Sequence, residues 1–510
     1  MATPSGNSVP LTGNPYLDGL SQGSSWSFPG TRVLSYSLNN IAEGSIWTAP
    51  EIAAVDKAFD AWEAVANVTF TRWGGPNQFE FFTSPADLAL GFTGNYLSAL
   101  IEPGTLGYAI FPSAVTGNQF LNDLSILVSQ PFTRSEYPHP EGDIFIDDFS
   151  PSWYPYIFEG DYGSFAIIHE IGHALGLKHP HDNGGQSDHK TFAQLGIGEL
   201  DSQFYTVMSY IEVPGAGPDY GHPVTPMFLD ILAIQAIYGP NMSYHKASDI
   251  YVLADDGALR TIWDAGGRDK FDASNINHSV LIDLDQNLGT FNLGGAVLGD
   301  YSGVGIAFGV TIEDATGGAG SDEIIGNVAA NSLIGNAGND SISGLAGNDL
   351  LVGGAGNDIL NGGNGNDAFG GSIGNDKLAG GAGNDTLDGG PGNDSLNGGT
   401  GRDIFLFNAP LGASSVDTIA GFVHADDTIR LDDDIFTALG QAANTVLTAA
   451  HYKENATGVA TDSSDRIIYN TTNGSVFYDR DGNGPTAAVK FAVIAGGPDE
   501  VDQTDFFVVG

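Results

Sequence analysis

Hydrophobic and polar positions divide the chain into three zones, and the first zone has mixed helix and strand patterns. In residues 51–66 apolar side chains recur near helical spacing, which is typical of a helix with one buried face. Similar spacing predicts helices at 164–175 and 228–238, and short β-branched or aromatic runs predict strands at 68–71 and 144–146. Helices and strands that alternate in this way favour an α/β or α+β domain.

The second zone is a repeat of nine residues that runs through positions 317–406 without a gap. It contains ten copies, such as 353–361 (GGAGNDILN) and 380–388 (GGAGNDTLD). The first position is Gly in all ten copies, the fourth is Gly in nine, and the eighth is apolar in all ten. The sixth position is Asn331 in one copy and Asp in the other nine: Asp322, Asp340, Asp349, Asp358, Asp367, Asp376, Asp385, Asp394 and Asp403.

This period predicts a stacked β structure that binds cations. One copy has room for a tight turn and a very short strand with a single inward residue, at position eight, so neighbouring copies must stack and share a core. Gly permits positive φ, and Asp brings a carboxylate beside backbone carbonyls, a set of oxygen ligands suited to Ca²⁺. A flexible Gly/Asn-rich linker would not keep ten apolar residues in phase. The repeat is identified as the RTX nonapeptide, which implies calcium ligation by the nine aspartates.

The third zone, 407–510, shows strand-like alternation with few helix signals. Residues 479–484 (DRDGNG) resemble a calcium loop, but the twelfth position of such a loop requires Glu and is Lys490 here. A hairpin turn is therefore predicted. The apolar run after Asp505 predicts, by its pattern alone, a fraying terminal strand.

Composition favours cations as partners and excludes several other classes. The 510 residues include 62 Asp+Glu against 17 Lys+Arg, for a net charge of −45. Nucleic acid and anionic membranes require a basic surface, so neither is expected as a partner. Without a run of about 18 apolar residues, no stable membrane insertion is expected either. The absence of Cys excludes disulfides and thiolate metal sites, and residues 1–13 lack the features of a secretory signal peptide.

The strongest local signal lies at 169–179 (HEIGHALGLKH). His169 and His173 are four residues apart, so on a helix they share a face and can bind one zinc ion. Gly176 can end that helix in a left-handed conformation and bring His179 back as a third ligand. Three protein ligands leave a fourth position for water, which is the arrangement of a catalytic zinc site. The alternative, a surface helix with chance histidines, does not account for Gly176 and His179.

The chemistry expected of such a site is hydrolysis. A single zinc ion would lower the pKa of its bound water to about 7 and would polarise a scissile carbonyl group. Glu170 would take the proton of the water as a general base and later pass it to the leaving amine.

The extended motif resembles the metzincin peptidases, whose pattern includes a downstream Met-turn. Here the turn is found at 205–210 (YTVMSY), which implies that Met208 packs beneath the zinc site and that Tyr210 supports the transition state. Together with the repeats and segments such as 226–241 (PMFLDILAIQAIYGPN), the motif is similar to the serralysin family. The resemblance implies an α+β metzincin (zincin-like) catalytic domain, a parallel β-roll and a C-terminal β-rich secretion region.

The same resemblance implies a location and partners. Serralysins leave the cell through a type I (ABC) exporter that reads an uncleaved C-terminal signal, and residues 505–510 resemble the acidic-then-apolar end of that signal. A secreted, extracellular protein is therefore expected. Protein and peptide substrates, a small proteinaceous inhibitor and a monomeric state are implied as well.

Some segments depart from the family pattern. Residues 244–250 (YHKASDI) lack the usual calcium loop, whereas 263–269 (WDAGGRD) match another, so Asp264 and Asp269 are candidate calcium ligands. Residues 135–156 are rich in Pro and aromatic residues, unlike the family segment. They include the predicted strand 144–146, which is expected to pair with an extended substrate.

Five further polar residues stay without a fixed role. Asp230 lies in an otherwise apolar helix and requires a buried partner, for which a zinc histidine is one option. Solvated or hydrogen-bonded side chains are expected for the remaining histidines considered, which are His139, His181, His189 and His222.

These patterns predict a secreted, calcium-stabilised zinc metalloendopeptidase that acts on extracellular proteins. A calcium-dependent RTX surface protein with a vestigial peptidase domain, and a peptidase dedicated to one partner protein, stay open as alternatives. The expected divisions are 1–13 (leader or prosegment), 14–244 (zinc peptidase domain), 245–316 (connecting β region), 317–406 (β-roll) and 407–510 (β-rich region with the secretion signal).

Overall fold

The computed structural model forms two compact units. The first unit is residues 1–247, 255–267 and 300–310, and the second is 248–254, 268–299 and 311–510. The residues that the structure describes are 3–4, 26–27, 32–40, 48–72, 88–92, 107–109, 144–146, 162–181, 190–211, 222–286, 295–297, 303–496 and 501–510.

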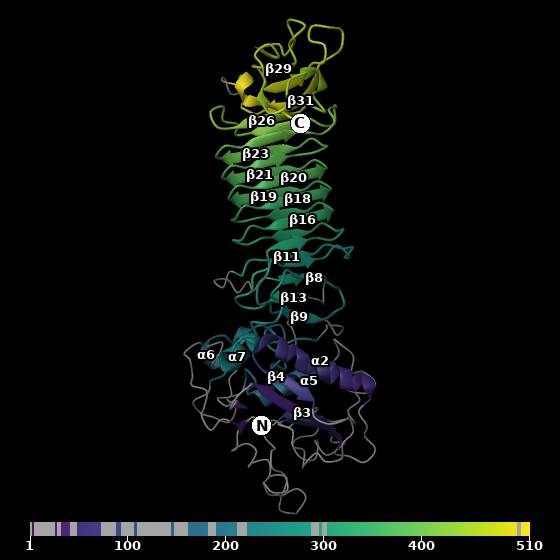
Figure 1. Ribbon diagram of the computed structural model, residues 1–510, viewed down its shortest axis with the longest axis vertical. Coiled ribbons are helices and arrows are strands. Elements are labelled where there is room, and N and C mark those ends of the chain that lie inside the picture. Colours follow the sequence, from purple (N-terminus) through teal and green to yellow (C-terminus); the bar gives the residue numbers. More distant parts are fainter. Residues whose placement is uncertain are drawn as a thin grey trace, which may run out of the picture. The chain divides into compact units, whose positions relative to one another are not determined.

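The first unit contains a five-stranded sheet in the order β4-β3-β5-β7-β6. Two of its strands, β3 and β4, are labelled in Figure 1. Neighbouring strands are parallel except β6, which runs antiparallel to β7. Because β7 pairs with β5 on one side and β6 on the other, it offers no open edge, and the prediction that a substrate pairs with 144–146 is wrong. The strands are β3 (Val33–Asn40), β4 (Thr69–Arg72), β5 (Leu88–Phe92), β6 (Gly107–Ala109) and β7 (Ile144–Ile146).

Two hydrogen bonds from neighbouring helices hold helix α5 (Tyr162–Leu175), which contains the whole HExxH motif, His169 to His173. The Nε1–H of Trp62, on α2 (Ala49–Val65), donates to the carbonyl of Ile168 at 3.1 Å. The hydroxyl of Tyr238, on α7 (Phe228–Tyr238), donates to the carbonyl of Leu175 at 2.7 Å. Trp62 is fully buried, so its replacement by Ala would cost about 3–5 kcal/mol. The three predicted helices are confirmed.

Shorter elements complete the described part of this unit. They are α6 (Phe192–Leu195), the 3₁₀ helix η2 (Gly198–Leu200), the antiparallel pair β1 (Thr3–Pro4) with β2 (Trp26–Ser27), and the parallel pair β9 (Leu259–Ile262) with β13 (Gly303–Ile306).

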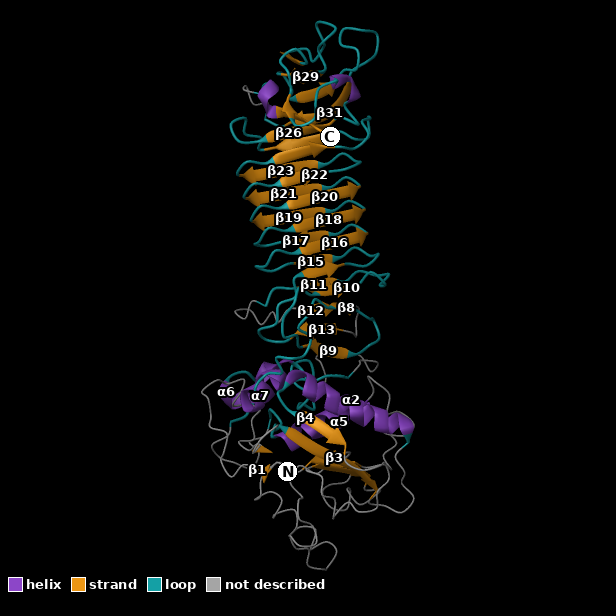
Figure 2. Cartoon of the chain, viewed as in Figure 1, coloured by secondary structure: helices purple, strands orange, loops and turns teal. Residues whose placement is uncertain are grey.

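The second unit is a parallel β-roll in which successive strands of the repeat alternate between two sheets (Figure 2). One sheet has, in spatial order, β8 (Ile250–Val252), β10 (Lys270–Asp272), β14 (Asp314–Thr316), β16 (Ser332–Ala337), β18 (Leu350–Ala355), β20 (Ala368–Ile373), β22 (Thr386–Asp388), β24 (Ile404–Phe407), β26 (Thr428–Asp432), β32 (Phe506–Val509) and β27 (Thr445–Val446). The other has β12 (Gly295–Val297), β11 (Leu281–Asp283), β15 (Glu323–Ile325), β17 (Ser341–Ser343), β19 (Ile359–Asn364), β21 (Lys377–Ala382), β23 (Ser395–Thr400), β25 (Asp417–Ala420), β31 (Val489–Ile494), β30 (Ser475–Tyr478), β29 (Ile467–Asn470) and β28 (Tyr452–Asn455). The 3₁₀ helices η3 (Thr437–Leu439) and η4 (Gln503–Asp505) lie in the same unit.

The repeat sequence explains the roll. Each strand pairs in register with the strand 18 residues further on, so that Leu351 lies beside Phe369. The eighth residue of every copy, from Ile324 to Phe405, is at most 4% exposed, which confirms the predicted inward position. Position four needs Gly because turns approach closely: a Cβ on Gly356 would lie 1.5 Å from the carbonyl oxygen of Gly338.

The roll geometry continues beyond the repeat sequence. Strand β32 pairs in parallel with β26 and in antiparallel with β27, and Phe506 and Val508 are fully buried. The prediction of a fraying end is therefore wrong, because these side chains complete the core. Strands β30 and β31 are antiparallel neighbours, so the predicted hairpin at 479–484 is confirmed. Among the described residues, no helix is long and apolar enough to cross a membrane.

Candidate metal centres

The first centre is formed by three histidines from the end of α5 and the turn that follows it. Gly176 has φ of 108° and ends the helix, as predicted, which returns the chain toward its last turn. The Nε2 atom of His179 lies 3.2 Å from Nε2 of His169 and 3.0 Å from Nε2 of His173. The structure thus brings together the three predicted zinc ligands at one point.

Backbone carbonyls orient two of these rings. The Nδ1–H of His169 donates to the carbonyl of Val207 at 2.7 Å, and that of His173 donates to the carbonyl of Leu177 at 2.8 Å. A ring that donates from Nδ1 carries its lone pair on Nε2, so both lone pairs point at the place where the rings meet. Burial lowers the pKa of His169 to about 3 and lowers that of His173 well below 6.5, so both rings are neutral. Neutral imidazole nitrogens that converge in this way fit a zinc ion.

The Met-turn supports His169 through a buried aspartate. Asp230, which is fully buried on α7, accepts hydrogen bonds from the Thr206 hydroxyl, the Val207 N–H and the Met227 N–H. Burial raises its pKa to about 7, although these three bonds favour the ionised form. Asp230 therefore has the buried partners that were predicted, but it reaches the histidine only through the Val207 peptide, whose carbonyl accepts from His169.

Met208 packs against the HExxH helix from below. A Cβ on Gly172 would lie 2.6 Å from the Sδ atom of Met208, so Gly172 leaves the space that this side chain fills. Glu170 is buried, with 6% exposure, between the two helical histidines in sequence. Tyr210 is 57% exposed, and its ring centroid lies 4.5 Å from that of His179. A buried carboxylate and an exposed phenol thus accompany the three histidines on adjoining segments.

Sequence reasoning left His181 unassigned, yet the structure places it at the same centre. Its ring is parallel to that of His179, with centroids 5.0 Å apart, and its centroid is 5.3 Å from that of Tyr210. Its Nδ1 atom lies 3.6 Å from Asp201, which accepts a 2.6 Å hydrogen bond from Ser209. No periodic spacing links these residues, so no sequence signal pointed to the cluster. His222 packs on Phe165, whereas His139 and His189 lie outside the described residues.

The second centre is a ladder of carboxylates along the roll. In each step the backbone N–H of one sixth-position residue donates to the Oδ1 atom of the Asp 18 residues later, as from Asp340 to Asp358 at 2.8 Å. The aspartates are nearly fully buried, at 2% exposure or less. Position one must be Gly because the carboxylate lies against it: a Cβ on Gly353 would be 2.2 Å from Oδ2 of Asp358.

Eight of these carboxylates have an oxygen without a hydrogen bond. The Oδ2 atoms of the eight sixth-position aspartates from Asp340 to Asp403 are buried and have no partner among the described residues. Burial raises the pKa of Asp340, Asp349 and Asp385 to about 6 and that of Asp376 to about 7. Buried anionic oxygens without donors are costly, and an oxygen-seeking cation such as Ca²⁺ would compensate them. The roll therefore fits calcium at these positions.

The ladder also extends beyond the repeat on both sides. The same type of bond, from a backbone N–H to the next carboxylate, joins Asp249 to Asp269, Asp269 to Glu313, Asp394 to Asp417, and Asp403 to Asp427, all at 2.8–3.0 Å. Sequence reasoning identified Asp269 but missed the other outlying acids. Two of them, Asp417 and Asp427, are followed two residues later by an apolar residue, as the sixth position of each repeat is. This spacing is the signal that could have identified them.

The predicted pair Asp264 and Asp269 falls in different units. Asp264 is 4% exposed and accepts a 2.7 Å bond from the N–H of Gly266, whereas Asp269 is fully buried within the ladder. Calcium binding by either residue stays a prediction.

Comparison with known proteins agrees with both centres. The Matrixin family matches residues 26–185, and the RTX calcium-binding nonapeptide repeat matches four stretches between 316 and 405. The chain is thus similar to the matrixin family over residues 26–185 and to the RTX repeat further along.

The curated relatives that the chain matches include several proteins named serralysin and one named Metallopeptidase AprA. It is 33% identical to Serralysin B of Dickeya chrysanthemi over 302 residues, which cover 55% of this chain and 54% of the relative. It is 34% identical to Serralysin of Proteus mirabilis over 285 residues, 52% of each chain, and 31% identical to Metallopeptidase AprA of Pseudomonas marginalis over 318 residues, 58% of each. The chain therefore spans about half the length of the relatives it matches, and it is their homologue over that part.

Proposed function

We propose that the chain is a secreted, calcium-stabilised zinc metalloendopeptidase that hydrolyses peptide bonds in extracellular proteins. The observation that carries the proposal is the convergence of three imidazole Nε2 atoms at 3.0–3.2 Å, with two rings held by backbone carbonyls. His169, His173 and His179 are the zinc ligands. The names of the curated relatives support the same activity.

The residues around the ligands divide the work of hydrolysis. A zinc ion supplies Lewis acidity toward a water molecule and the substrate carbonyl group. Glu170 accepts a proton from the attacking water at its carboxylate and returns it to the leaving amine. The exposed phenol of Tyr210 donates a hydrogen bond to the carbonyl oxygen of the substrate as negative charge develops there.

An extended substrate would pair with β6, the outer strand of the described sheet, because β7 is already paired on both sides. Residues Gly107–Ala109 run antiparallel to β7, so a peptide that adds to their outer edge continues the sheet. This places the specificity of the enzyme on β6 and its flanks rather than on 144–146.

The roll binds calcium through the eight aspartates from Asp340 to Asp403, whose Oδ2 atoms lack donors. Without calcium these buried carboxylates repel one another, so the roll is unstable where calcium is scarce. Such a roll suits export as an unfolded chain by a type I exporter, followed by folding in extracellular calcium. In this scheme the C-terminal residues 505–510 serve as the uncleaved signal before they join the core as β32.

Replacement of the general base tests the proposed activity. We expect Glu170→Ala to lower casein hydrolysis by a factor of about 10²–10⁴ while one zinc ion per chain is retained, because Glu170 moves a proton and is not a ligand. The control is Glu323→Ala, which removes an exposed carboxylate from the roll and should leave the rate unchanged. Hydrolysis by Glu170→Ala at the wild-type rate would sink the mechanism. A wild-type protein that binds zinc without cleaving any protein would favour the vestigial binding protein.

A further inference from the structure

The turns of the roll are of two kinds, which differ in what meets the sixth-position side chain. We call a turn open when the Oδ2 atom of its Asp lacks a hydrogen bond, as in the eight copies from 335 to 406. We call a turn closed when a backbone N–H four residues earlier donates to that side chain. Closed turns have Gly318 donating to Asp322 Oδ2 at 2.6 Å and Asn327 donating to Asn331 Oδ1 at 2.8 Å.

Backbone conformation separates the two kinds in the same way. In all eight open turns the second residue has positive φ: Asn336, Leu345, Gly354, Gly363, Ser372, Gly381, Gly390 and Gly399, at 71–112°. Gly318 and Asn327 hold the same position in the closed turns, and neither is among the described residues with positive φ. For non-glycine residues such as Leu345 this conformation costs about 1–2 kcal/mol. Open turns therefore carry an uncompensated carboxylate, and those with Asn336, Leu345 or Ser372 carry backbone strain as well, whereas the two closed turns carry neither.

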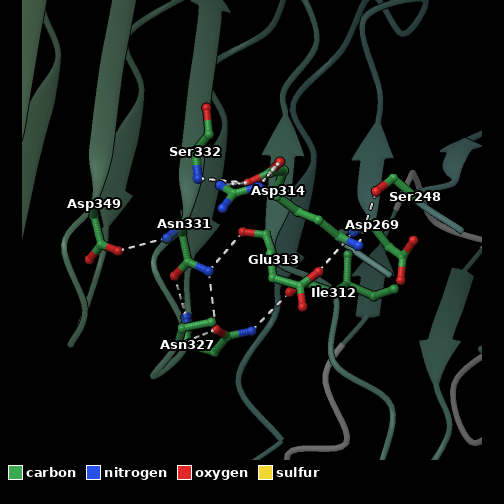
Figure 3. Close-up of polar contacts among 11 residues, drawn as sticks. Ser248, Asp269, Ile312, Glu313, Asp314, Asn327, Asn331, Ser332 and Asp349 are labelled. Carbon is green, nitrogen blue, oxygen red and sulfur yellow. Dashed lines mark hydrogen bonds and ion pairs between the residues drawn. The ribbon is translucent and has the colours of Figure 1, made fainter. Parts of the chain in front are cut away.

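At the start of the roll, protein groups take over the role that a cation would have. The Nδ2 group of Asn331 donates to the carbonyl of Glu313 at 2.7 Å and to Oδ1 of Asn327 at 3.1 Å (Figure 3). Asp314 beside it accepts the N–H of Ser332 at 2.9 Å and pairs with the guanidinium of Arg268 at 2.7 Å. Arg268 thus neutralises Asp314, and the Asn331 amide donates two hydrogen bonds at a position where the open turns have a carboxylate.

The far end of the ladder closes in the same manner. Asp427 accepts the N–H of Asp403 at Oδ1 and the N–H of Val423, four residues before it, at Oδ2, at 3.0 and 2.8 Å. Both oxygens of this last acid are therefore used by backbone donors. The same bond, from a backbone N–H to the side chain four residues later, occurs here although residues 423–427 lie outside the repeat. The ends of the ladder are therefore recognised by this bond and not by their sequence.

From these bonds we infer that calcium binds only the open turns, at Asp340 to Asp403, and that the turns at Asp322, Asn331 and Asp427 are metal-free ends. This inference rests on the calcium binding proposed above and makes it selective. In a closed turn a backbone N–H occupies the place beside the carboxylate that a cation needs. The turns at 317–334 consequently keep their structure when calcium is withdrawn, and they present a formed edge on which the open turns assemble when it returns.

Calcium binding by matched variants of the full chain tests the inference. Asp322→Asn and Asp358→Asn remove the same charge from a closed and an open turn, and bound calcium is counted by equilibrium dialysis with ⁴⁵Ca²⁺. We expect Asp322→Asn to keep the wild-type count and Asp358→Asn to lose at least one ion. An equal loss in both would overturn the inference and leave the proposed function intact, whereas a wild-type chain that binds no calcium would overturn both.

Two further measurements do not depend on how well Asp322→Asn folds. Asn331→Asp restores the repeat consensus, but Asn327 N–H still meets the side chain, so no additional calcium is expected; a gain of one ion would contradict the inference. Hydrogen exchange of the wild-type chain in excess EGTA should leave peptides from 317–334 protected while peptides from 335–406 exchange at least tenfold faster than with calcium. Equal deprotection of both stretches would refute the metal-free start.

Discussion

The two metal centres differ in when their ligands come together. In the first unit the three histidines lie on one helix and the turn after it, and hydrogen bonds to Val207 and Leu177 orient the rings without any metal. In the roll each carboxylate is linked to a turn 18 residues away, so an oxygen site exists only once turns have stacked. The first centre is thus preorganised before a metal binds, whereas in the proposed function the second is assembled together with its ion.

Selective metal removal should separate the two centres by the largest effect. A zinc-preferring chelator such as 1,10-phenanthroline should abolish casein hydrolysis and leave the far-ultraviolet circular dichroism unchanged, because helix α5 is held by Trp62 and Tyr238. EGTA should remove most of the β signal, because the buried carboxylates of the open turns then lose their counterions. Equal loss of β signal with both chelators would show that the first centre is not preorganised.

Core packing should affect the roll nearly as strongly as its ion. Leu360 is fully buried at position eight, whereas its neighbour Ile359 is 50% exposed. We expect Leu360→Ala to destabilise the calcium-loaded roll by about 2–5 kcal/mol and to raise the calcium concentration at half-folding. Ile359→Ala is the matched control and should change stability by about 0.5 kcal/mol or less. Calcium titrations followed by circular dichroism measure both, and similar midpoints for the two variants would contradict the shared core.

Preorganisation of the zinc centre can be weakened without touching a ligand. Asp230→Asn replaces a carboxylate that accepts from Thr206, Val207 and Met227, so the carbonyl that holds His169 becomes less well fixed. Loss of such outer support typically costs 10–100-fold in metal affinity. We expect zinc competition assays to show a weakening in that range, with an unchanged calcium midpoint for the roll. Unchanged zinc affinity would mean that the Met-turn keeps its position without Asp230.

Features set by spacing within a short stretch of sequence could be predicted, whereas contacts between residues far apart in the sequence could not. The helix at 228–238 and the inward eighth positions were found because both are set by spacing within a short window. The outlying ladder acids Asp249, Glu313 and Asp417 were missed because the spacing of 18 breaks outside the repeat, although the bonds persist. The contact between His181 and Asp201 joins residues 20 apart that belong to no periodic pattern, so no sequence signal indicated it.

The smallest expected effect is a response of the calcium-free roll to pH. Its carboxyls have folded pKa values of about 6 for Asp340 and about 7 for Asp376, above the value of about 3.9 for an unfolded chain. In the absence of calcium their protonation therefore stabilises the folded roll fully below about pH 4, and this contribution is lost as pH rises through 6–7. Chain freed of calcium on a chelating resin should regain part of its β signal between pH 7.5 and 5, since protons then replace the ion.

The histidine centre provides the contrast, because the pKa of His169 is about 3 and its ring stays neutral over this range. Circular dichroism of the calcium-free chain measures how much β signal returns between pH 7.5 and 5. With saturating calcium the sign reverses, because protons then compete with the ion for the same oxygens. A calcium-free β signal no higher at pH 5 than at pH 7.5 would show that charge on the buried carboxylates is not what keeps the metal-free roll unfolded.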